Sequence, residues 1–143
     1  MTLLALLSAG YILINAIPTA PSVTSGRPLR IEPQQLAAGE PLQLEWQGRP
    51  ITLLKSGPVA EDREQILVIF NHGTRLGCPL DYSPPGSHDA PIQPWPGGFR
   101  ESCADSWYDT AGEAIPESDV VPALLRPPYH ISPDGVLWIG DSP

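Results

Sequence analysis

The sequence predicts an all-β domain that is small and rich in loops, preceded by one apolar N-terminal segment. Three observations support this fold class. The chain has 19 prolines and 13 glycines among 143 residues, and both residue types break the interior of helices. Residues 40–55 alternate apolar and polar side chains as a half-buried strand does, and residues 66–70 form a short apolar run. One domain is expected at this length.

Composition and charge exclude one class of partner. The formal net charge is −8, and the eight lysines and arginines are scattered singly along the chain. A nucleic-acid-binding surface needs a basic patch or stripe, so no nucleic-acid partner is expected. Any long-range electrostatic steering would attract cationic partners.

The N-terminal segment is predicted to be separate from the domain. Residues 2–17 are apolar apart from two hydroxyl residues and one asparagine, and an extension to residue 20 approaches the length that spans a bilayer. We expect residues 1–20 to be a membrane anchor, residues 21–30 a linker and residues 31–143 the β domain. A cleaved signal peptide and a packed helix are the alternatives, although the positive n-region of a signal peptide is absent.

The first half of the domain carries the clearest strand signals. Leu42, Leu44 and Trp46 alternate with polar neighbours, a tight turn is expected at residues 47–50, and residues 51–54 would return as the second strand of a hairpin. The run at residues 66–70, ILVIF, is typical of a strand buried on both faces. A short helical turn is the only helix expected in the domain, near residues 33–38.

The second half is expected to consist mostly of loops until its last hairpin. Six prolines between residues 79 and 96 exclude a helix there. Residues 129–131, a turn at 133–135 and residues 136–139 are predicted to form the closing hairpin.

Two cysteines, Cys78 and Cys103, are the only ones in the chain. An even pair in an exported protein is most often a disulfide, which here would close a loop of about 25 residues and contribute ~3 kcal/mol. The pair is a poor metal site by itself, because a tetrahedral site needs four ligands. The spacing of His72, His88 and His130 does not supply the other two.

Two loops and several flanking segments resemble the Rieske iron–sulfur proteins, in particular the membrane-anchored subunit of cytochrome bc complexes. The family pattern has one loop reading Cys-Thr-His-x-Gly-Cys and a second reading Cys-Pro-Cys-His-Gly-Ser-x-Tyr-Asp. This chain has GTRLGC at residues 73–78 and ESCADSWYD at residues 101–109. The resemblance extends over nearly the whole chain through four other segments: WQGRPITLL at 46–54, ILVIFNHG at 66–73, RPPYHI at 126–131 and VLWIG at 136–140.

The resemblance implies a Rieske-like antiparallel β-sandwich with a loop-rich tip, and it places the two cysteines at the family's loop-bridging disulfide. It also implies four substituted ligand positions. A Rieske centre holds two irons with two cysteines and two histidines. In this chain the cysteine-ligand positions are Gly73 and Glu101, and the histidine-ligand positions are Arg75 and Ala104.

None of those four residues is a ligand of the Rieske type. Glycine and alanine have no donor atom, arginine is a permanent cation, and one carboxylate does not hold a thiophilic cluster. We therefore expect no cofactor, with a [2Fe–2S] cluster as the alternative. Ser106 and Tyr108 match positions that in the family donate hydrogen bonds to the cluster sulfurs or a ligand sulfur.

Two further hypotheses concern the tip. Arg75 and Glu101 would face each other across the former cluster site, where an ion pair could fill the gap. The proline-rich segment at residues 79–100, with Trp95 and Phe99, would either cover the tip or present aromatic side chains to a partner.

The expected function is that of a membrane-anchored accessory or structural subunit of a respiratory electron-transfer complex, without its own cluster and not an enzyme by itself. Its partners would be the membrane and cytochrome-containing subunits. It would lie in the bacterial or mitochondrial inner membrane as a single-pass protein, with the soluble domain on the periplasmic or intermembrane side. The alternatives are an active [2Fe–2S] subunit of a quinol–cytochrome c reductase and an exported binding module released by signal cleavage.

Overall fold

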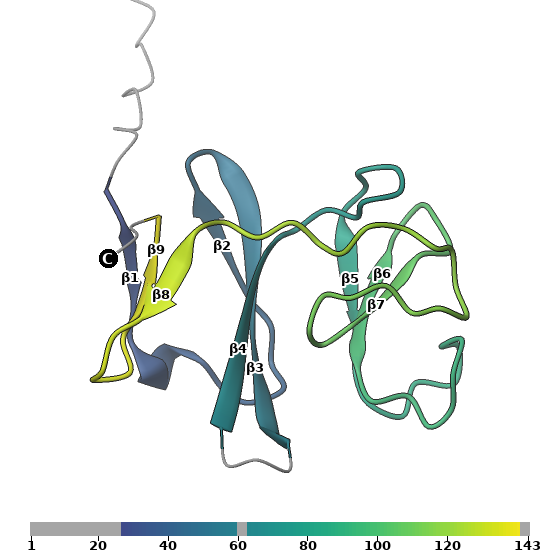
Figure 1. The fold of residues 1–143 in the computed structure, drawn as a ribbon, viewed down its shortest axis with the longest axis horizontal. Helices are drawn as coiled ribbons and strands as arrows, with labels where there is room; N and C mark the ends of the chain where they lie inside the picture. Colours follow the sequence, from purple (N-terminus) through teal and green to yellow (C-terminus); the bar gives the residue numbers. More distant parts are fainter. Residues whose placement is uncertain (1–26, 60–62, 141–143) are drawn as a thin grey trace, which may run out of the picture.

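A computed structural model describes residues 27–59 and 63–140 (Figure 1). Within these residues the chain forms antiparallel sheets and no α-helix, so the all-β prediction is confirmed. The elements are β1 (Leu29–Ile31), a 3-10 turn (Pro33–Gln35), β2 (Leu42–Trp46), β3 (Arg49–Val59), β4 (Arg63–Phe70), β5 (Leu80–Ser83), β6 (Gly98–Glu101), β7 (Trp107–Asp109), β8 (Tyr129–Ile131) and β9 (Leu137–Ile139).

The strands form three separate three-stranded sheets with the orders β1-β9-β8, β2-β3-β4 and β5-β6-β7. The expected hairpin of β2 and β3 is present. Its turn is shorter than expected, because Gln47 and Gly48 alone connect the strands, with φ values of 50° and 72°. Such a pair of positive φ values matches the twist of the flanking strands, so Arg49 and Pro50 already belong to β3.

The sheet β2-β3-β4 lies in the middle of the domain, as Figure 1 shows. Residues 67–70 of β4 are all buried, as the apolar run predicted. Alternate side chains of β3 and β4 point into two different cores. One core lies toward β1 and β9, and its central residues are Ile51, Leu53, Val68, Phe70, Leu137 and Ile139. The other lies toward the tip sheet and contains Leu54, Leu67, Ile69, Leu80, Phe99, Tyr108 and Leu124.

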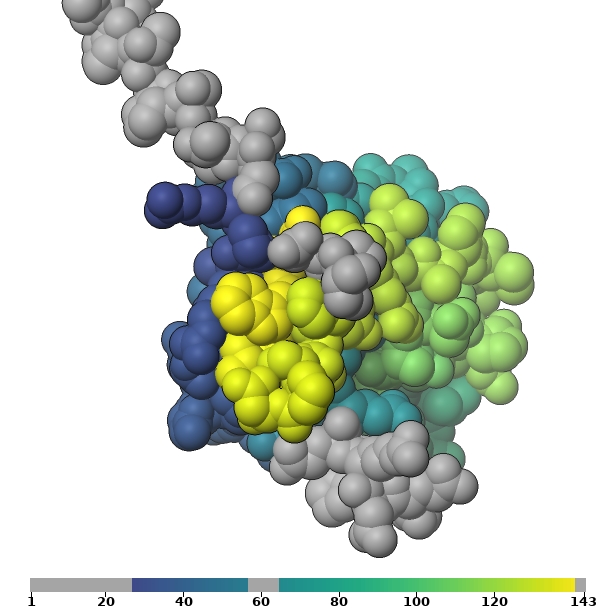
Figure 2. Space-filling model, turned by 60° about the vertical axis from the view of Figure 1, so that its left-hand side comes forward, coloured from purple at the N-terminus to yellow at the C-terminus, as the bar shows by residue number. Residues whose placement is uncertain are grey.

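The beginning and the end of the described chain are joined in one sheet. Strand β9 pairs with β8 in the predicted closing hairpin and with β1 on its other side. Figure 2 shows the C-terminal hairpin packed beside the N-terminal residues of the domain. Leu29 and Arg30 therefore pair within the sheet, although the sequence assigned them to the linker.

The tip sheet β5-β6-β7 was not predicted, because its strands have only three or four residues and lie among prolines and glycines. Gly98 explains how β6 fits against β7. A Cβ atom there would lie 2.0 Å from the backbone oxygen of Tyr108, and φ is +157°. The expected helical turn is present only as the 3-10 turn of residues 33–35.

The predicted membrane anchor at residues 1–20 lies outside the described residues. No helix in residues 27–59 or 63–140 is long and apolar enough to cross a bilayer.

The first core provides a test of the central sheet. Leu53 has an exposed fraction of 0%, and we expect Leu53→Ala to lower the free energy of unfolding by about 2–5 kcal/mol, because it leaves a cavity. Val120 is 86% exposed, so Val120→Ala should change the free energy of unfolding by no more than about 0.5 kcal/mol. Urea unfolding measures both. Equal effects would contradict the assignment of Leu53 to the core.

Candidate functional site

The candidate site lies where two loops meet at the tip. The first loop follows β4, and the second connects β6 to β7. The predicted disulfide between Cys78 and Cys103 is present and joins the loops, with a distance of 6.0 Å between the two Cα atoms. The backbone supports the same contact, because the N–H of Ser102 donates to the carbonyl of Pro79 at 2.9 Å. The two loops are thus fixed to each other at their ends.

Glu101 is the centre of this arrangement. It is the last residue of β6, and its exposed fraction is 0%. Its Oε1 accepts hydrogen bonds from the backbone N–H groups of Leu76 at 2.8 Å and Cys78 at 3.0 Å. Its Oε2 accepts one from the N–H of Arg75 at 3.1 Å. A buried carboxylate is costly unless it is hydrogen-bonded, and here three amides of the first loop surround it.

Glycine is needed at position 73 because the Glu101 side chain lies directly against it. A Cβ atom at this position would lie 2.2 Å from Cδ and from Oε2 of Glu101. No real Cβ atom tolerates such a distance, so any larger residue forces Glu101 to move. Gly73 and Glu101 are therefore in direct contact, and the Glu101 side chain occupies the space next to Gly73.

The predicted ion pair between the side chains of Arg75 and Glu101 is wrong. The Nε atom of Arg75 lies 3.9 Å from Oδ2 of Asp119, and both side chains are about half exposed. Only the backbone N–H of Arg75 contacts Glu101. The amides of the loop are close and fixed, and they satisfy the carboxylate without ordering a long arginine side chain.

The second loop and β7 contribute three further residues beside the site: Ala104, Ser106 and Tyr108. The N–H of Ala104 donates to the backbone oxygen of Glu101 at 3.2 Å. Tyr108 Oη accepts a hydrogen bond from the N–H of Thr74 at 3.0 Å and thereby holds the first loop. Among the described residues, Ser106 Oγ is the one buried side-chain nitrogen or oxygen atom without a hydrogen-bond partner.

The residues at this site do not fit a two-iron cluster. Within the described chain, the one group of three or more potential metal ligands comprises Cys78, Glu101 and Cys103, whose ligand atoms lie within 4.8 Å of one another. The two sulfurs are bonded to each other and provide no thiolate. His72 does not contribute either, since its ring stacks on Phe70 at 6.1 Å and lies 3.1 Å from a guanidinium nitrogen of Arg49.

The proline-rich segment packs its aromatic residues inward. Trp95 and Phe99 are 2% and 1% exposed. Trp95 packs edge-on against Trp107 at a centroid distance of 5.4 Å, beside the buried Ile115, and donates from Nε1 to the carbonyl of Ser83. The hypothesis that these aromatic side chains are presented to a partner is therefore wrong. The segment covers β7.

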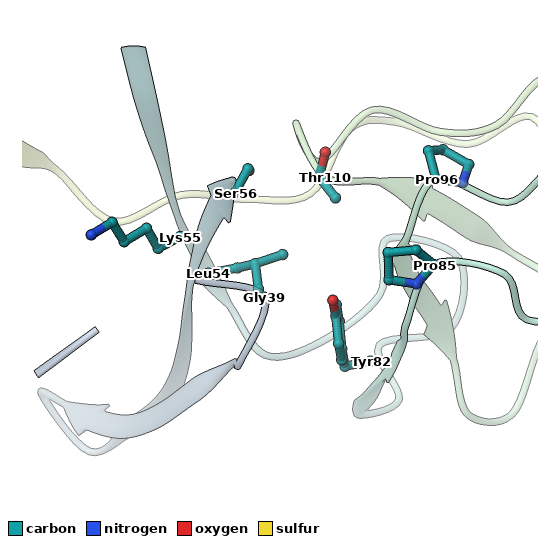
Figure 3. A pocket seen from close by; sticks show the side chains of 8 residues that line it. All are labelled: Gly39, Leu54, Lys55, Ser56, Tyr82, Pro85, Pro96 and Thr110. Carbon is teal, nitrogen blue, oxygen red and sulfur yellow. The ribbon is translucent and has the colours of Figure 1, made fainter. Parts of the chain in front are cut away.

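A cleft of about 330 Å³ is lined by residues of the central sheet and of the segments around the tip sheet. Figure 3 shows Leu54 on one wall facing Tyr82, Pro85 and Pro96 on the other, with the amine of Lys55 directed away from them. Burial raises the pKa of Tyr82. Sequence reasoning missed this cleft because its lining comes from widely separated segments, and it brings together no set of catalytic or metal-binding side chains.

Comparisons with known proteins support the resemblance to the Rieske family. No family model matches the chain. It is 26% identical over 146 residues to the ubiquinol–cytochrome c reductase iron–sulfur subunit of Bradyrhizobium diazoefficiens, covering 86% of this chain and 77% of that protein. Among solved structures, a chain of a hyperthermophilic respiratory Complex III is similar with a TM-score of 0.53 at 15% identity, covering 88% of this chain and 82% of that one. At 15% identity, the likeness to the solved structure concerns the fold alone.

The contact between Gly73 and Glu101 gives a double-mutant test. Gly73→Ala should destabilise the protein by about 1–3 kcal/mol, because the new Cβ displaces the carboxylate from its three amides. Glu101→Ala should cost ~3 kcal/mol, since it leaves buried N–H groups unpaired. In the Glu101→Ala background, however, Gly73→Ala should cost less than about 1 kcal/mol. Urea unfolding of the oxidised protein measures the cycle, and additive effects would contradict the contact.

Ser106 provides a second test, with Tyr108→Phe as the matched control. Removing an unpaired buried hydroxyl relieves a desolvation cost, so Ser106→Ala should leave stability unchanged or raise it by up to about 1 kcal/mol. Tyr108→Phe removes a hydrogen bond to Thr74 and should lower stability by about 1 kcal/mol. A clear loss of stability in Ser106→Ala would show that its hydroxyl has a partner.

Proposed function

We propose that this chain is a Rieske-like accessory or structural subunit of a respiratory electron-transfer complex that carries no [2Fe–2S] cluster of its own. It would contribute a docking domain rather than an electron-transfer step. It would not be an enzyme by itself.

The observation that carries this proposal is the position of the Glu101 carboxylate. In our assignment, Gly73 and Glu101 replace the two cysteine ligands, and Arg75 and Ala104 replace the two histidines. The Glu101 side chain fills the space next to Gly73 and is held by three amides of the first loop. A cluster would have to displace this side chain and would find no thiolate or imidazole to replace it.

The disulfide agrees with this proposal and with the family's loop-bridging disulfide, so it does not separate the two candidates. A cluster with ligands from both loops cross-links them, and a domain without one needs another connection. Here the Cys78–Cys103 bond and the hydrogen bonds of Glu101 both join the first loop to the second. These two connections would hold the tip in shape without iron, which is what a docking domain requires.

The location and partners are proposed from the sequence and its relative. The apolar residues 1–20 would anchor the chain as a single pass in a bacterial or mitochondrial inner membrane, with the β domain on the periplasmic or intermembrane side. A disulfide agrees with that compartment. The relative is an iron–sulfur subunit of ubiquinol–cytochrome c reductase, so cytochrome-containing subunits are the proposed partners.

An active [2Fe–2S] subunit is the second candidate function. The name of the relative favours it, and so does the unpaired hydroxyl of Ser106, since a cluster sulfur is the kind of acceptor that this hydroxyl lacks. The missing ligands argue against it, because the one described group of three or more potential metal ligands consists of two bonded sulfurs and a carboxylate.

The iron and acid-labile sulfide content separates the two candidates. The chain should be purified in mild detergent from membranes of a host that assembles Rieske clusters, beside an authentic Rieske subunit as control. We expect no more than a trace of iron and sulfide per chain and none of the visible absorption of a [2Fe–2S] centre. Two irons and two sulfides per chain would refute the proposal.

The co-purifying proteins test the accessory role independently of the cofactor. We expect the native chain to remain in the membrane fraction and to co-purify with cytochrome-bearing subunits. A cluster-free chain recovered alone in the soluble fraction would instead establish the exported binding module.

A further inference from the structure

We propose that reduction of the Cys78–Cys103 disulfide converts the tip into a binding site for one thiophilic divalent cation of the zinc type, with Cys78, Cys103 and Glu101 as its protein ligands. The proposal does not depend on the proposed function, since it concerns a single ion held by different sulfurs from those of a Rieske centre.

The geometry places three suitable donors together. The two Sγ atoms and a carboxylate oxygen of Glu101 lie within 4.8 Å of one another. Two thiolates and a carboxylate are ligands that zinc takes, and three protein ligands leave the fourth tetrahedral position for water. Sequence spacing did not indicate this site, because Glu101 reaches the sulfurs only through the fold of β6 and the first loop.

Glu101 is already ordered in the orientation that a ligand needs. Its carboxylate is desolvated and held by the N–H groups of Arg75, Leu76 and Cys78. Hydrogen bonds of this kind orient metal-ligating carboxylates in known sites. Oε1 already accepts two amide hydrogen bonds, but Oε2 accepts only one and keeps a free lone pair, so metal binding through Oε2 would not require any of these contacts to break.

The reaction is a two-electron reduction followed by proton release. A dithiol reductant attacks the disulfide, the S–S bond breaks, and two thiols form as the dithiol becomes a cyclic disulfide. The cation then displaces one proton from each thiol and binds two thiolates and the carboxylate. Cys103 is exposed and Cys78 is half-buried, so the reductant has access from solvent.

Metal binding would replace one cross-link between the loops by another. In the oxidised state the sulfur–sulfur bond connects them, and in the reduced state the cation would do so through Cys78 of the first loop and Cys103 of the second. The tip would keep its shape in both redox states, provided that the metal is present.

The test uses the full-length protein before and after reduction by an immobilised dithiol, with Co²⁺ as a spectroscopic probe and Zn²⁺ as competitor. The reduced protein should bind one Co²⁺ per chain with a thiolate-to-cobalt charge-transfer band that Zn²⁺ abolishes. The oxidised protein should show no such band. Absence of the band after complete reduction, or an equal band before it, would overturn the proposal.

Variants assign the ligands. Cys78→Ser and Cys103→Ser should each lose tight binding. Glu101→Gln should weaken it by about 10–100-fold, whereas Glu117→Gln, which changes an exposed carboxylate outside the proposed ligand set, should leave it unchanged. Equal metal affinity of the Glu101→Gln variant and the unaltered chain would overturn the proposed ligand set.

Circular dichroism in the near ultraviolet keeps the test decisive if reduction unfolds the tip. In that case Zn²⁺ should restore the native spectrum of the unaltered chain, and the Glu101→Gln variant should need much more metal. Binding of metal by the two thiols without recovery of the native spectrum would contradict a preformed site that includes Glu101.

Discussion

The tip depends on one buried carboxylate. Glu101 is fully enclosed, and three backbone amides from the facing loop bind its two oxygens. This interaction determines the path of residues 75–78, requires glycine at position 73, and brings Cys78 close to Cys103. Charge-assisted hydrogen bonds to a buried carboxylate are stronger than neutral ones, and breaking them leaves both sides unpaired. A small change at position 73 or 101 therefore affects the whole loop.

The rest of the structure supports this interaction in layers. The central sheet fixes β4, from which the first loop starts, because its residues pack into cores on both faces. The tip sheet fixes β6, which ends at Glu101, and β7, from which Tyr108 reaches Thr74. The disulfide joins the two loops at the surface, where Cys103 is exposed. The hydroxyl of Ser106 is the exception, since among the described residues it is the one buried side-chain nitrogen or oxygen atom without a hydrogen-bond partner.

The sequence predicted the parts of the fold that have strong local patterns. Alternation in β2, the apolar run in β4 and the turn between β8 and β9 indicated those strands correctly. Strands β5, β6 and β7 escaped prediction, because three or four residues among prolines carry no readable period. Their stability comes from pairing and from the side chains of Trp95, Phe99 and Tyr108, which only the folded chain brings together.

For the site, sequence reasoning pointed to residues that the structure brings together, and it missed how they interact. The motifs identified Gly73, Glu101 and the two cysteines, but facing positions and opposite charges suggested that Arg75 would pair with Glu101. The structure shows that nearby amides take the carboxylate, while the guanidinium lies near Asp119. Backbone donors have no signature in a sequence, so a carboxylate held by a loop cannot be distinguished there from one held by arginine.

Amide hydrogen exchange of the oxidised, full-length protein, followed residue by residue by NMR, tests the central interaction most directly. Arg75 and Leu76 have exposed side chains in a surface loop, where amides normally exchange at nearly the rate of an unfolded chain. If their N–H groups bind Glu101, the amides of Arg75, Leu76 and Cys78 should be strongly protected, and the protection should disappear together in Glu101→Ala. Rapid exchange of all three in the unaltered chain would contradict the account.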